Sequence, residues 1–295
     1  MANSKLKVTV VQHSCTDDIN ANQQQIKSAI IQAANQGANL VVLPELHNTL
    51  YFCQSEKQEN FDLAETIPGP STKQLSELAN DYDCVIVASL FEKRAPGLYH
   101  NTAIVFDTDG SIAGTYRKMH IPDDPGYYEK YYFAVGDLGF RPINTSIGKL
   151  GVLICWDQWF PEAARLMALA GAEILIYPTA IGWSPEDSKQ QKSIELDAWV
   201  TIQRAHAIAN GLPLVVANRC GLEEDFGNQS NKIDFWGNSF VTGCQGEILG
   251  QVKSQPAIFS ANINLTQSES VRRSWPFLRD RRVDAYYDLL RQYID

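Results

Sequence analysis

The stretch LKVTVVQHSCTDDINANQQQIKSAIIQAANQGANLVVLPE, residues 6–45, combines two kinds of apolar pattern that together indicate the fold class. Residues 6–12 and 40–43 are short, nearly continuous apolar runs, which are typical of buried strands. The segment between them carries apolar residues at helical spacing and ends at Gly37. A strand, a helix and a second strand in this order form a βαβ unit, which predicts a sheet with parallel pairing.

The helices of the first half are expected to begin at short polar side chains. Asp17 or Asp18 is placed to cap the first helix, which continues to about Gln36. Ser71 is placed to cap a second helix, which leads into a strand at residues 84–90. The inner face of the first helix is predicted to hold four apolar side chains: Ile19, Ile26, Ile30 and Ala34.

The pattern changes in the middle of the chain, where residues 101–106 and 111–116 flank a turn at residues 107–110 and predict a hairpin. Alternation of strands and helices then returns. Further strands are expected at residues 150–155, 173–177, 214–218, 235–242 and 257–264, and further helices at residues 161–171 and 198–210. Since no linker rich in Pro, Gly or Ser divides the chain, we predict one layered α/β domain with mixed sheets over residues 6–265 and a C-terminal arm at residues 266–295.

The composition is that of an ordinary globular protein, with 44% hydrophobic and 20% charged residues in a chain of 295. The net charge of −9, without a basic stripe, disfavours nucleic-acid binding. The apolar runs are too short for a signal peptide or for a membrane span of about 20 residues. The six cysteines form no C-x-x-C pair and indicate free thiols in a reducing compartment. We therefore expect a cytoplasmic protein with no nucleic-acid or membrane partner.

The arm at residues 266–295 interleaves cationic and aromatic side chains. They are Arg272, Arg273, Arg279, Arg281 and Arg282 with Trp275, Phe277, Tyr286 and Tyr287. Acidic residues at positions 280, 284 and 288 interrupt the positive charge, which weighs against nucleic-acid binding. Because arginine and aromatic side chains are enriched at protein interfaces, we expect the arm to pack against a neighbouring subunit of a homo-oligomer, a dimer or larger.

Several sequence motifs that would indicate other chemistry are absent. The five histidines never pair at a spacing of two or four residues, and there is no H-E-x-x-H, which disfavours a zinc hydrolase. The chain also lacks G-x-G-x-x-G, the Walker loop and the G-x-S-x-G nucleophile elbow. No metal site and no nucleotide site is therefore predicted.

Three polar residues of complementary chemistry follow predicted apolar strands: Glu45, Lys118 and Cys155. Taken singly, each has an ordinary interpretation, as a surface carboxylate, a solvated lysine and a cysteine packed in the core. In α/β sheets, however, ligand sites collect beyond the carboxyl ends of the strands. A catalytic thiol needs a base or cation for activation, and the intermediate of amide hydrolysis needs a fixed positive charge. Together the three residues therefore indicate thiol-dependent hydrolysis.

Three short blocks surround these residues: Leu43-Pro44-Glu45, Tyr116-Arg117-Lys118-Met119-His120 and Gly151-Val152-Leu153-Ile154-Cys155-Trp156-Asp157. In this order they resemble the signature blocks of the nitrilase, or carbon–nitrogen hydrolase, superfamily. The resemblance extends from residue 7 to about residue 265. It implies a four-layer αββα sandwich with two mixed β-sheets, usually assembled into dimers.

The same resemblance implies roles for individual residues. Cys155 would be the nucleophile, Glu45 the general base and Lys118 the cation that stabilises the intermediate. Glu129 matches a fourth carboxylate that many members place beside the lysine. The backbone N–H of Trp156 is expected to share the oxyanion with Lys118. No metal or organic cofactor is needed for this mechanism.

The charge of the substrate is suggested by residues around the nucleophile. Members that hydrolyse carbamoyl amino acids commonly hold the substrate carboxylate with arginine or histidine just after the cysteine. The corresponding residues are Asp157, Gln158, Trp159 and Phe160, so a carboxylate would lack its cationic partner. Four other side chains suit a distal ammonium through ion pairing or cation–π contact: Tyr51, Trp183, Glu186 and Asp187. The last three are expected on a polar loop over residues 183–195, and the predicted partner is a small cationic ureido-amine.

Residues 118–133, 178–182 and 271–275 are most similar to the N-carbamoylputrescine amidase branch of the superfamily. This resemblance implies hydrolysis of N-carbamoylputrescine to putrescine, carbon dioxide and ammonia in polyamine biosynthesis. Alternatives stay open, because an ω-amidase, a nitrilase or an N-carbamoyl-amino-acid hydrolase would use the same three residues. A non-catalytic binding protein on this fold and a thiol redox protein are alternatives from other classes.

Overall fold

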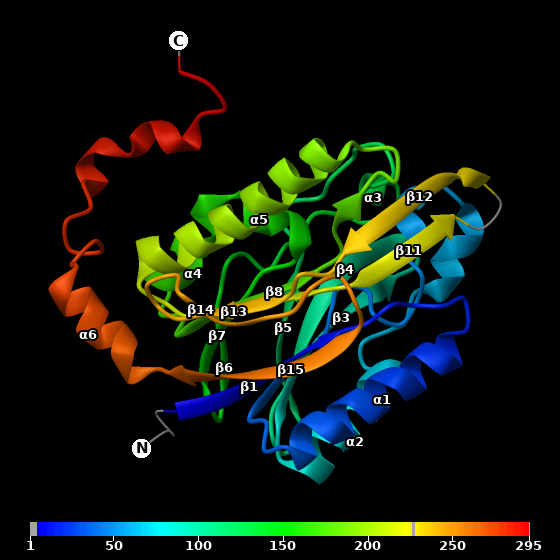
Figure 1. Cartoon of the computed structure of the whole chain (residues 1–295), viewed down its shortest axis with the longest axis horizontal. Coiled ribbons are helices and arrows are strands. Elements are labelled where there is room, and N and C mark those ends of the chain that lie inside the picture. The colour runs from blue at the N-terminus through cyan, green and yellow to red at the C-terminus, as the bar shows by residue number, and fades with distance from the viewer. Residues whose placement is uncertain (1–4, 226–227, 295) are drawn as a thin grey trace.

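Two six-stranded sheets form the body of the molecule, which a computed structural model describes over residues 5–225 and 228–294. The sheets lie face to face, and helices cover the outer face of each (Figure 1). Both sheets combine parallel and antiparallel pairs. The expected αββα sandwich with two mixed β-sheets is therefore confirmed.

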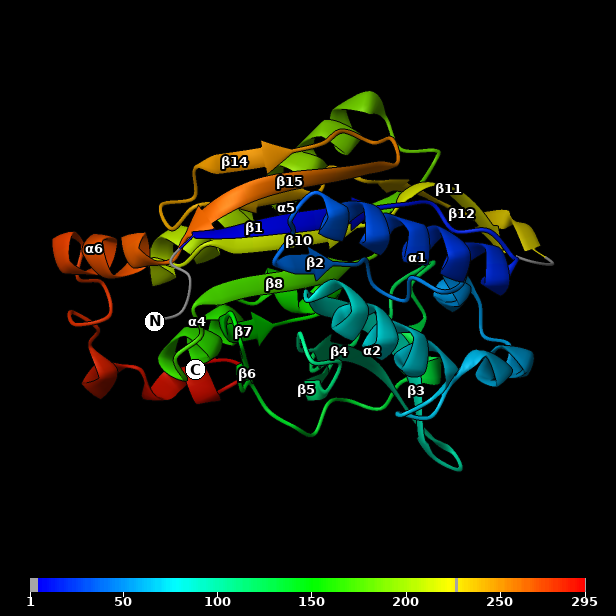
Figure 2. The same cartoon turned by 90° about the horizontal axis from the view of Figure 1, so that it is seen from below.

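The first sheet has the strand order β15-β1-β2-β3-β4-β5. Its strands are β1 (Lys5–Gln12), β2 (Leu40–Val42), β3 (Val85–Ala95), β4 (Leu98–Phe106), β5 (Ile112–Arg117) and β15 (Ala257–Asn264). The strands β1, β2 and β3 pair in parallel, as the βαβ pattern predicts, and the other pairs are antiparallel. The helices α1 (Ile19–Asn35) and α2 (Pro70–Tyr82) cover its outer face (Figure 2).

The second sheet has the order β14-β13-β10-β8-β7-β6. Its strands are β6 (Ile143–Thr145), β7 (Gly148–Val152), β8 (Ile174–Thr179), β10 (Leu214–Asn218), β13 (Phe240–Thr242) and β14 (Ile248–Gln251), and it is covered by α4 (Pro161–Leu169) and α5 (Lys189–Asn210). A small third sheet beside the sandwich contains β9 (Gly182–Trp183), β11 (Cys220–Asp225) and β12 (Asn228–Trp236). Short helical segments complete the body: η1 (Phe52–Gln54), η2 (Gln58–Leu63), α3 (Glu129–Tyr132) and η3 (Cys155–Trp159).

Alternate residues of the buried strands face two different cores. In β2, Leu40 and Val42 belong to the core between the sheets, whereas Val41 belongs to the core beneath α1 and α2. In β3, Val87 and Ile86 divide in the same way. A strand that is buried on both faces needs a continuous apolar run, which is why these strands are readable from the sequence.

The first helix begins at Asp18, whose carboxylate accepts the amide hydrogens of Asn20 at 2.9 Å and Ala21 at 3.1 Å. Its predicted inner face is partly wrong. Ile26 and Ile30 are buried and Ala34 is partly buried, but Ile19 is 36% exposed. Ile19 is the first helical residue and lines a surface cavity instead of the core.

Other predicted boundaries also change. The cap of α2 is Gly69, and Ser71 lies inside the helix, where its hydroxyl donates to Glu65 at 2.5 Å. The strand predicted at residues 235–242 is two strands, because Gly237 and Asn238 both adopt positive φ and form a turn between β12 and β13. The strand predicted at residues 150–155 ends at Val152.

The helix α5 is longer than expected and begins at Lys189, where Ser188 caps it by accepting the amide hydrogen of Gln191 at 3.1 Å. Residues 189–195 are therefore helical rather than part of a loop. Most of the side chains in this stretch are exposed, so it carries no apolar period by which the helix can be recognised. No helix in the described part of the chain is both long and apolar enough to cross a bilayer.

The arm begins with α6 (Thr266–Ser274) and continues through η4 (Val283–Ala285) and η5 (Tyr287–Leu290). It lies outside the sandwich (Figures 1 and 2), and large apolar side chains along it are exposed, from 39% at Tyr286 to 93% at Leu290. Such exposure is unusual over so many neighbouring residues of a stable monomer. Its packing on a second subunit stays a prediction.

We predict that Tyr287→Asp combined with Leu290→Asp shifts the protein toward a smaller species, because two exposed apolar side chains of the arm become charged. Sedimentation velocity measures the change. The matched control is Val135→Asp, which places a charge at a residue of the body that is 65% exposed and is expected to leave the mass unchanged. A wild-type monomer, or equal masses for all three proteins, contradicts the prediction.

Candidate active site

Glu45, Lys118 and Cys155 follow the carboxyl ends of β2, β5 and β7 and meet inside the molecule. The Lys118 ammonium donates to Glu45 Oε1 at 2.8 Å, and the charges of both groups act on the Cys155 thiol. All three residues are buried, with exposed fractions of 0, 1 and 4% in that order. The carboxyl end of β8 contacts both Glu45 and Cys155. Thr179 O accepts the Glu45 amide hydrogen at 3.4 Å, and Ala180 O accepts the Cys155 thiol at 3.7 Å.

A second carboxylate completes the surroundings of the lysine. Lys118 Nζ also donates to Glu129 Oε2 at 2.6 Å, and the Tyr51 hydroxyl donates to the other oxygen of Glu129 at 2.7 Å. Asn101 Nδ2 donates to Glu45 Oε1 at 2.6 Å. Glu45 Oε2 is buried and has no hydrogen-bond partner among the described residues. One oxygen of Glu45 therefore holds the lysine, and the other is free to accept a proton.

Burial and charge determine how protons are distributed in this cluster. Burial alone disfavours the Lys118 ammonium, but the charges of Glu129 and Glu45 outweigh it and hold the lysine pKa well above its usual value. Burial raises the pKa of Glu129 to about 7, against the opposing charge of Lys118. Burial and the charge of Glu45 raise the pKa of the Cys155 thiol, and Lys118 counteracts them only in part. The resting sulfur is therefore a thiol that needs a base.

The backbone at Cys155 is held in a sharp bend. Cys155 adopts φ +41°, a left-handed conformation that a non-glycine residue takes only where its surroundings enforce it. The buried Asp157 carboxylate provides that enforcement. Asp157 Oδ2 accepts from the Ile154 amide at 2.9 Å and from the Tyr116 hydroxyl at 2.8 Å, and Oδ1 accepts from the His120 amide at 3.0 Å. The Asp157 carboxylate therefore holds the backbone next to Cys155, and both of its oxygens are engaged within the protein.

Trp156 and Tyr51 lie close to the cluster, although not in equivalent ways. The Trp156 side chain is partly buried and packs edge-on against Trp159, and its backbone N–H directly follows the cysteine. Tyr51 is fully buried, and its hydroxyl is occupied by Glu129. The structure therefore places Tyr51 in the carboxylate network rather than at a free ammonium-binding surface.

The other predicted ammonium-binding residues, Trp183, Glu186 and Asp187, lie in the segment between β8 and α5. This segment, together with Lys192, is called the rim below. Glu186 is exposed, and the Asp187 carboxylate accepts the Ser184 amide hydrogen at 2.9 Å. Among the contacts of the described residues, neither acid touches the catalytic cluster. The partly buried Trp183 carries the Lys192 ammonium 5.4 Å from its ring centroid, and Lys192 lies 3.9 Å from the Asp234 carboxylate.

A cavity of about 220 Å³ connects this rim to the loop before α3, with Tyr127, Tyr128, Trp183 and Ser184 among its walls. The Tyr127 hydroxyl accepts the Gly182 amide hydrogen at 3.1 Å and thereby ties the loop to β9. A side chain at Gly182 has no room, because a Cβ there would lie 2.4 Å from the Asp234 carbonyl oxygen. The loop and the rim thus form one connected wall.

Sequence reasoning missed several groups that support the site. Asn101 and Asp157 carry a signal, since each is a polar residue next to or within a predicted apolar strand. Arg219 directly follows the strand at residues 214–218 and satisfies the same strand-end rule as Cys155. Lys192 carries none, because it lies in the part of α5 that was expected to be a loop. Over the described residues, no three or more His, Cys, Asp or Glu side chains gather as metal ligands.

The negative charge of Glu129 raises the pKa of the Cys155 thiol, so Glu129→Gln is expected to speed alkylation of Cys155 by iodoacetamide at neutral pH. A change of one pKa unit corresponds to about a tenfold change in the thiolate fraction. Peptide mass spectrometry measures the rate, and alkylation of Cys84 in the same sample is the internal control, since Cys84 belongs to the core beneath α1 and α2. An unchanged or slower rate at Cys155 alone argues against this electrostatic coupling.

Comparison with known proteins gives this geometry a context. Residues 7–273 match the carbon–nitrogen hydrolase family. The N-carbamoylputrescine amidase of Solanum lycopersicum is 43% identical over 98% of this chain and 96% of its own length. A citrullinase of Francisella tularensis subsp. tularensis is 44% identical over 99% of this chain and its full length. The two relatives are thus about equally similar.

A solved structure is closer in sequence. The crystal structure of a carbon–nitrogen hydrolase from Helicobacter pylori G27 superposes with a TM-score of 0.96, is 54% identical, and covers 98% of this chain and all of its own. The family match and the full-length relatives agree with the sandwich fold and with the three signature blocks. The chain belongs to the carbon–nitrogen hydrolase, or nitrilase, superfamily.

Proposed function

We propose that the protein is a thiol-dependent amidohydrolase that converts N-carbamoylputrescine to putrescine, carbon dioxide and ammonia, a step of polyamine biosynthesis. One observation carries the catalytic part of this proposal. The buried Cys155 lies in the same charged cluster as Glu45, whose Oε2 has no partner among the described residues, and as the Lys118 ammonium. A thiol, a base with a free oxygen and a fixed cation are what acyl transfer requires.

In the first half of the reaction, Glu45 Oε2 takes the proton of the Cys155 thiol, and the thiolate attacks the ureido carbon. The negative charge that develops on the ureido oxygen is stabilised by Lys118 and the Trp156 N–H, with about 3–4 kcal/mol for each well-placed donor. Glu45 then gives the proton to the leaving nitrogen, and ammonia departs. The sulfur is left bonded to the carbonyl carbon of a thiocarbamate.

In the second half, Glu45 takes a proton from water, and the resulting hydroxide attacks the same carbon. The bond from carbon to sulfur breaks, Glu45 gives its proton to the leaving sulfur and so restores the thiol, and the carbamic acid product loses carbon dioxide to give the free amine. Lys118 keeps its position throughout, because two carboxylates hold it at 2.8 and 2.6 Å. No step calls on a metal or organic cofactor.

The cationic nature of the substrate is supported by the tomato relative and by the acidic rim. Glu186 and Asp187 follow Trp183, which lines the cavity of about 220 Å³ beside the loop before α3. They are solvent-accessible and can meet an ammonium at the far end of a four-carbon chain. The net charge of −9 also favours the approach of a cation.

A ureido-amino-acid is the second candidate substrate class, and Lys192 is the observation that favours it. Its ammonium lies over Trp183, at the same rim as the two acids, and its side chain is 23% exposed. A carboxylate at the far end of the substrate would find its partner there. The citrullinase relative, 44% identical over nearly the whole chain, supports this alternative.

An ammonia-release assay tests the function directly. N-carbamoylputrescine is expected to be the best substrate in a panel with citrulline, N-carbamoyl-β-alanine, an ω-amide and a nitrile. Cys155→Ser is expected to lower kcat on the order of 1,000-fold or more, because the weaker nucleophile replaces the thiol. Cys84→Ser, in the core beneath α1 and α2, is the control for general damage. Faster release from citrulline supports the second candidate, and full turnover by Cys155→Ser refutes the nucleophile.

The rim is tested by substitutions that remove either its negative or its positive charge. Glu186→Gln with Asp187→Asn is expected to raise KM for N-carbamoylputrescine by about fivefold, the equivalent of about 1 kcal/mol for partly exposed ion pairs. KM for neutral butylurea is expected to stay the same. Lys192→Gln reports on the alternative, since it raises KM only for a substrate whose far end is a carboxylate. Equal effects on the charged and neutral substrates remove the acids from the proposed site.

A further inference from the structure

We propose that Arg219 and Glu223 are positioning residues, which hold the loop from Glu45 to Tyr51 so that the Glu45 carboxylate meets Lys118 and the Tyr51 phenol meets Glu129 in the reactive arrangement. The proposal rests on the catalytic roles proposed above for Glu45 and Cys155. It concerns any carbon–nitrogen substrate of the enzyme, because neither residue lies at the rim that would select one.

The Arg219 guanidinium holds the backbone of the loop. Arg219 is completely buried, and its Nη2 donates to the carbonyl oxygens of Glu45 at 3.2 Å, Leu46 at 2.7 Å and Thr49 at 3.1 Å. Its Nη1 donates to both oxygens of Glu223 at 2.9 Å. One planar guanidinium thus joins three carbonyls of the loop to a strand of the small third sheet.

The Glu223 carboxylate holds the far end of the same loop. Glu223 lies in β11 and accepts the Tyr51 amide hydrogen at 2.7 Å. The Arg219 guanidinium also lies 5.9 Å from the Tyr51 ring centroid and 5.3 Å from that of Phe235. Tyr51 is therefore held at its backbone by Glu223 and at its hydroxyl by Glu129.

These contacts connect the pair to the lysine by two routes. On one route, Arg219 holds the backbone of Glu45, and Glu45 binds Lys118. On the other, Glu223 holds Tyr51, Tyr51 donates to Glu129, and Glu129 binds Lys118. A displacement of the loop would change both carboxylates of the lysine at once.

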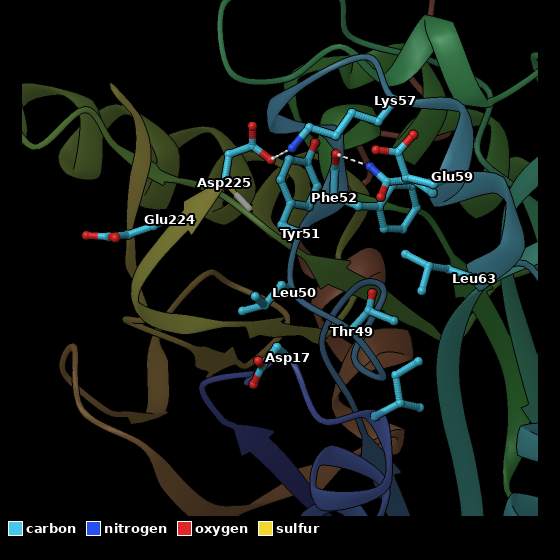
Figure 3. Close-up of a pocket in the computed structure, with 12 residues that line it drawn as sticks. Asp17, Thr49, Leu50, Tyr51, Phe52, Lys57, Glu59, Leu63, Glu224 and Asp225 are labelled. Atoms are coloured by element: carbon cyan, nitrogen blue, oxygen red, sulfur yellow. Dashed lines mark hydrogen bonds and ion pairs between the residues drawn. The ribbon is translucent and has the colours of Figure 1, made fainter. Parts of the chain in front are cut away.

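The loop needs such restraint because its backbone is bent and one of its sides is hollow. Leu46, the residue after the catalytic base, adopts φ +48°, which a leucine rarely takes. Figure 3 shows the hollow side of the loop, where Thr49, Leu50, Tyr51 and Phe52 line a cavity. The volume of this cavity is about 250 Å³. Close packing, which fixes most buried segments, is therefore missing along that side.

A buried ion pair is seldom retained for stability alone, because the cost of desolvating two charges roughly cancels their attraction. In this pair, every hydrogen bond of the Arg219 guanidinium goes to the loop or to Glu223, among the contacts of the described residues. That distribution fits a positioning role. Lysine keeps the positive charge but has no planar fork, so it cannot hold three carbonyls and a carboxylate together.

The test compares Arg219→Lys and Glu223→Gln with wild type and with Leu78→Ala. Leu78 is a buried residue of α2 and belongs to the core between the helices α1 and α2 and the first sheet, so its truncation lowers stability without touching the site. Substrates are N-carbamoylputrescine and citrulline, and the thermal midpoint of each variant is measured first. Arg219→Lys is expected to lower kcat at least about tenfold with KM within about twofold, the pattern of a lost transition-state interaction. Glu223→Gln keeps an acceptor for the Tyr51 amide and is expected to lose less.

The proposal is overturned if a folded Arg219→Lys or Glu223→Gln keeps the wild-type kcat, or if Leu78→Ala loses as much kcat at the same loss of thermal midpoint. If Arg219→Lys does not fold, Glu223→Gln alone decides. The rate of Cys155 alkylation by iodoacetamide provides a readout that needs no substrate, and Arg219→Lys is expected to raise it, because displaced Glu45 and Glu129 carboxylates no longer hold the pKa of the Cys155 thiol as far above its usual value. If the wild-type enzyme releases no ammonia from either compound, the proposed function fails, and the alkylation rates still test the positioning pair.

Discussion

The ammonium of Lys118, buried between the carboxylates of Glu45 and Glu129, is the interaction on which the site depends. Placing three charges out of water is costly, and it is tolerated only where the attractions are close and the remaining lone pairs are bonded. Here the nitrogen is 2.8 and 2.6 Å from the two oxygens, and Asn101 and Tyr51 add further donors. Among the carboxylate oxygens of this cluster, Glu45 Oε2 is the one that is buried without a partner, and it is the oxygen that the proposed mechanism uses as base.

The backbones beside the proposed reactive groups are hydrogen-bonded by other buried side chains, for which no chemical step is proposed. Asp157 holds the bend at Cys155, and Arg219 holds the bend after Glu45. Both bends place a non-glycine residue at positive φ, at Cys155 and at Leu46. Strain of this kind persists only where surrounding contacts enforce it, and in this molecule the enforcing contacts are buried charged groups.

The charged groups of the rim differ from those of the cluster in their exposure to solvent. The cluster around Lys118 is buried, whereas Glu186, Asp187 and Lys192 retain access to solvent. Exposed charges interact weakly and adapt to what binds. The chain is about equally similar to an N-carbamoylputrescine amidase and to a citrullinase, and the two candidate substrates proposed above differ in the charges that the rim would meet.

The sequence alone was sufficient for the layered architecture and for choosing three residues, Glu45, Lys118 and Cys155, that lie in one buried cluster. Strands buried on both faces, such as β2, must be continuous apolar runs, and a polar residue at the end of such a run is conspicuous, as Glu45 and Cys155 are. Such a residue can be recognised from the few residues that precede it in the sequence. This is not the case in the first turns of α5, where exposed side chains carry no apolar period, and the helical turns that hold Lys192 were not predicted.

Only the tertiary structure decided which distant groups share a charge or a backbone contact. Arg219 reaches the loop at Glu45 across more than 170 positions, and Tyr51 meets Glu129 rather than open solvent. Such pairings depend on how two sheets and a small third sheet pack in space, and no spacing along the chain records it. The sequence therefore determined what chemistry the protein carries, whereas the packing determined how that chemistry is held, because hydrogen bonds and buried charges act over a few ångströms and are indifferent to distance along the chain.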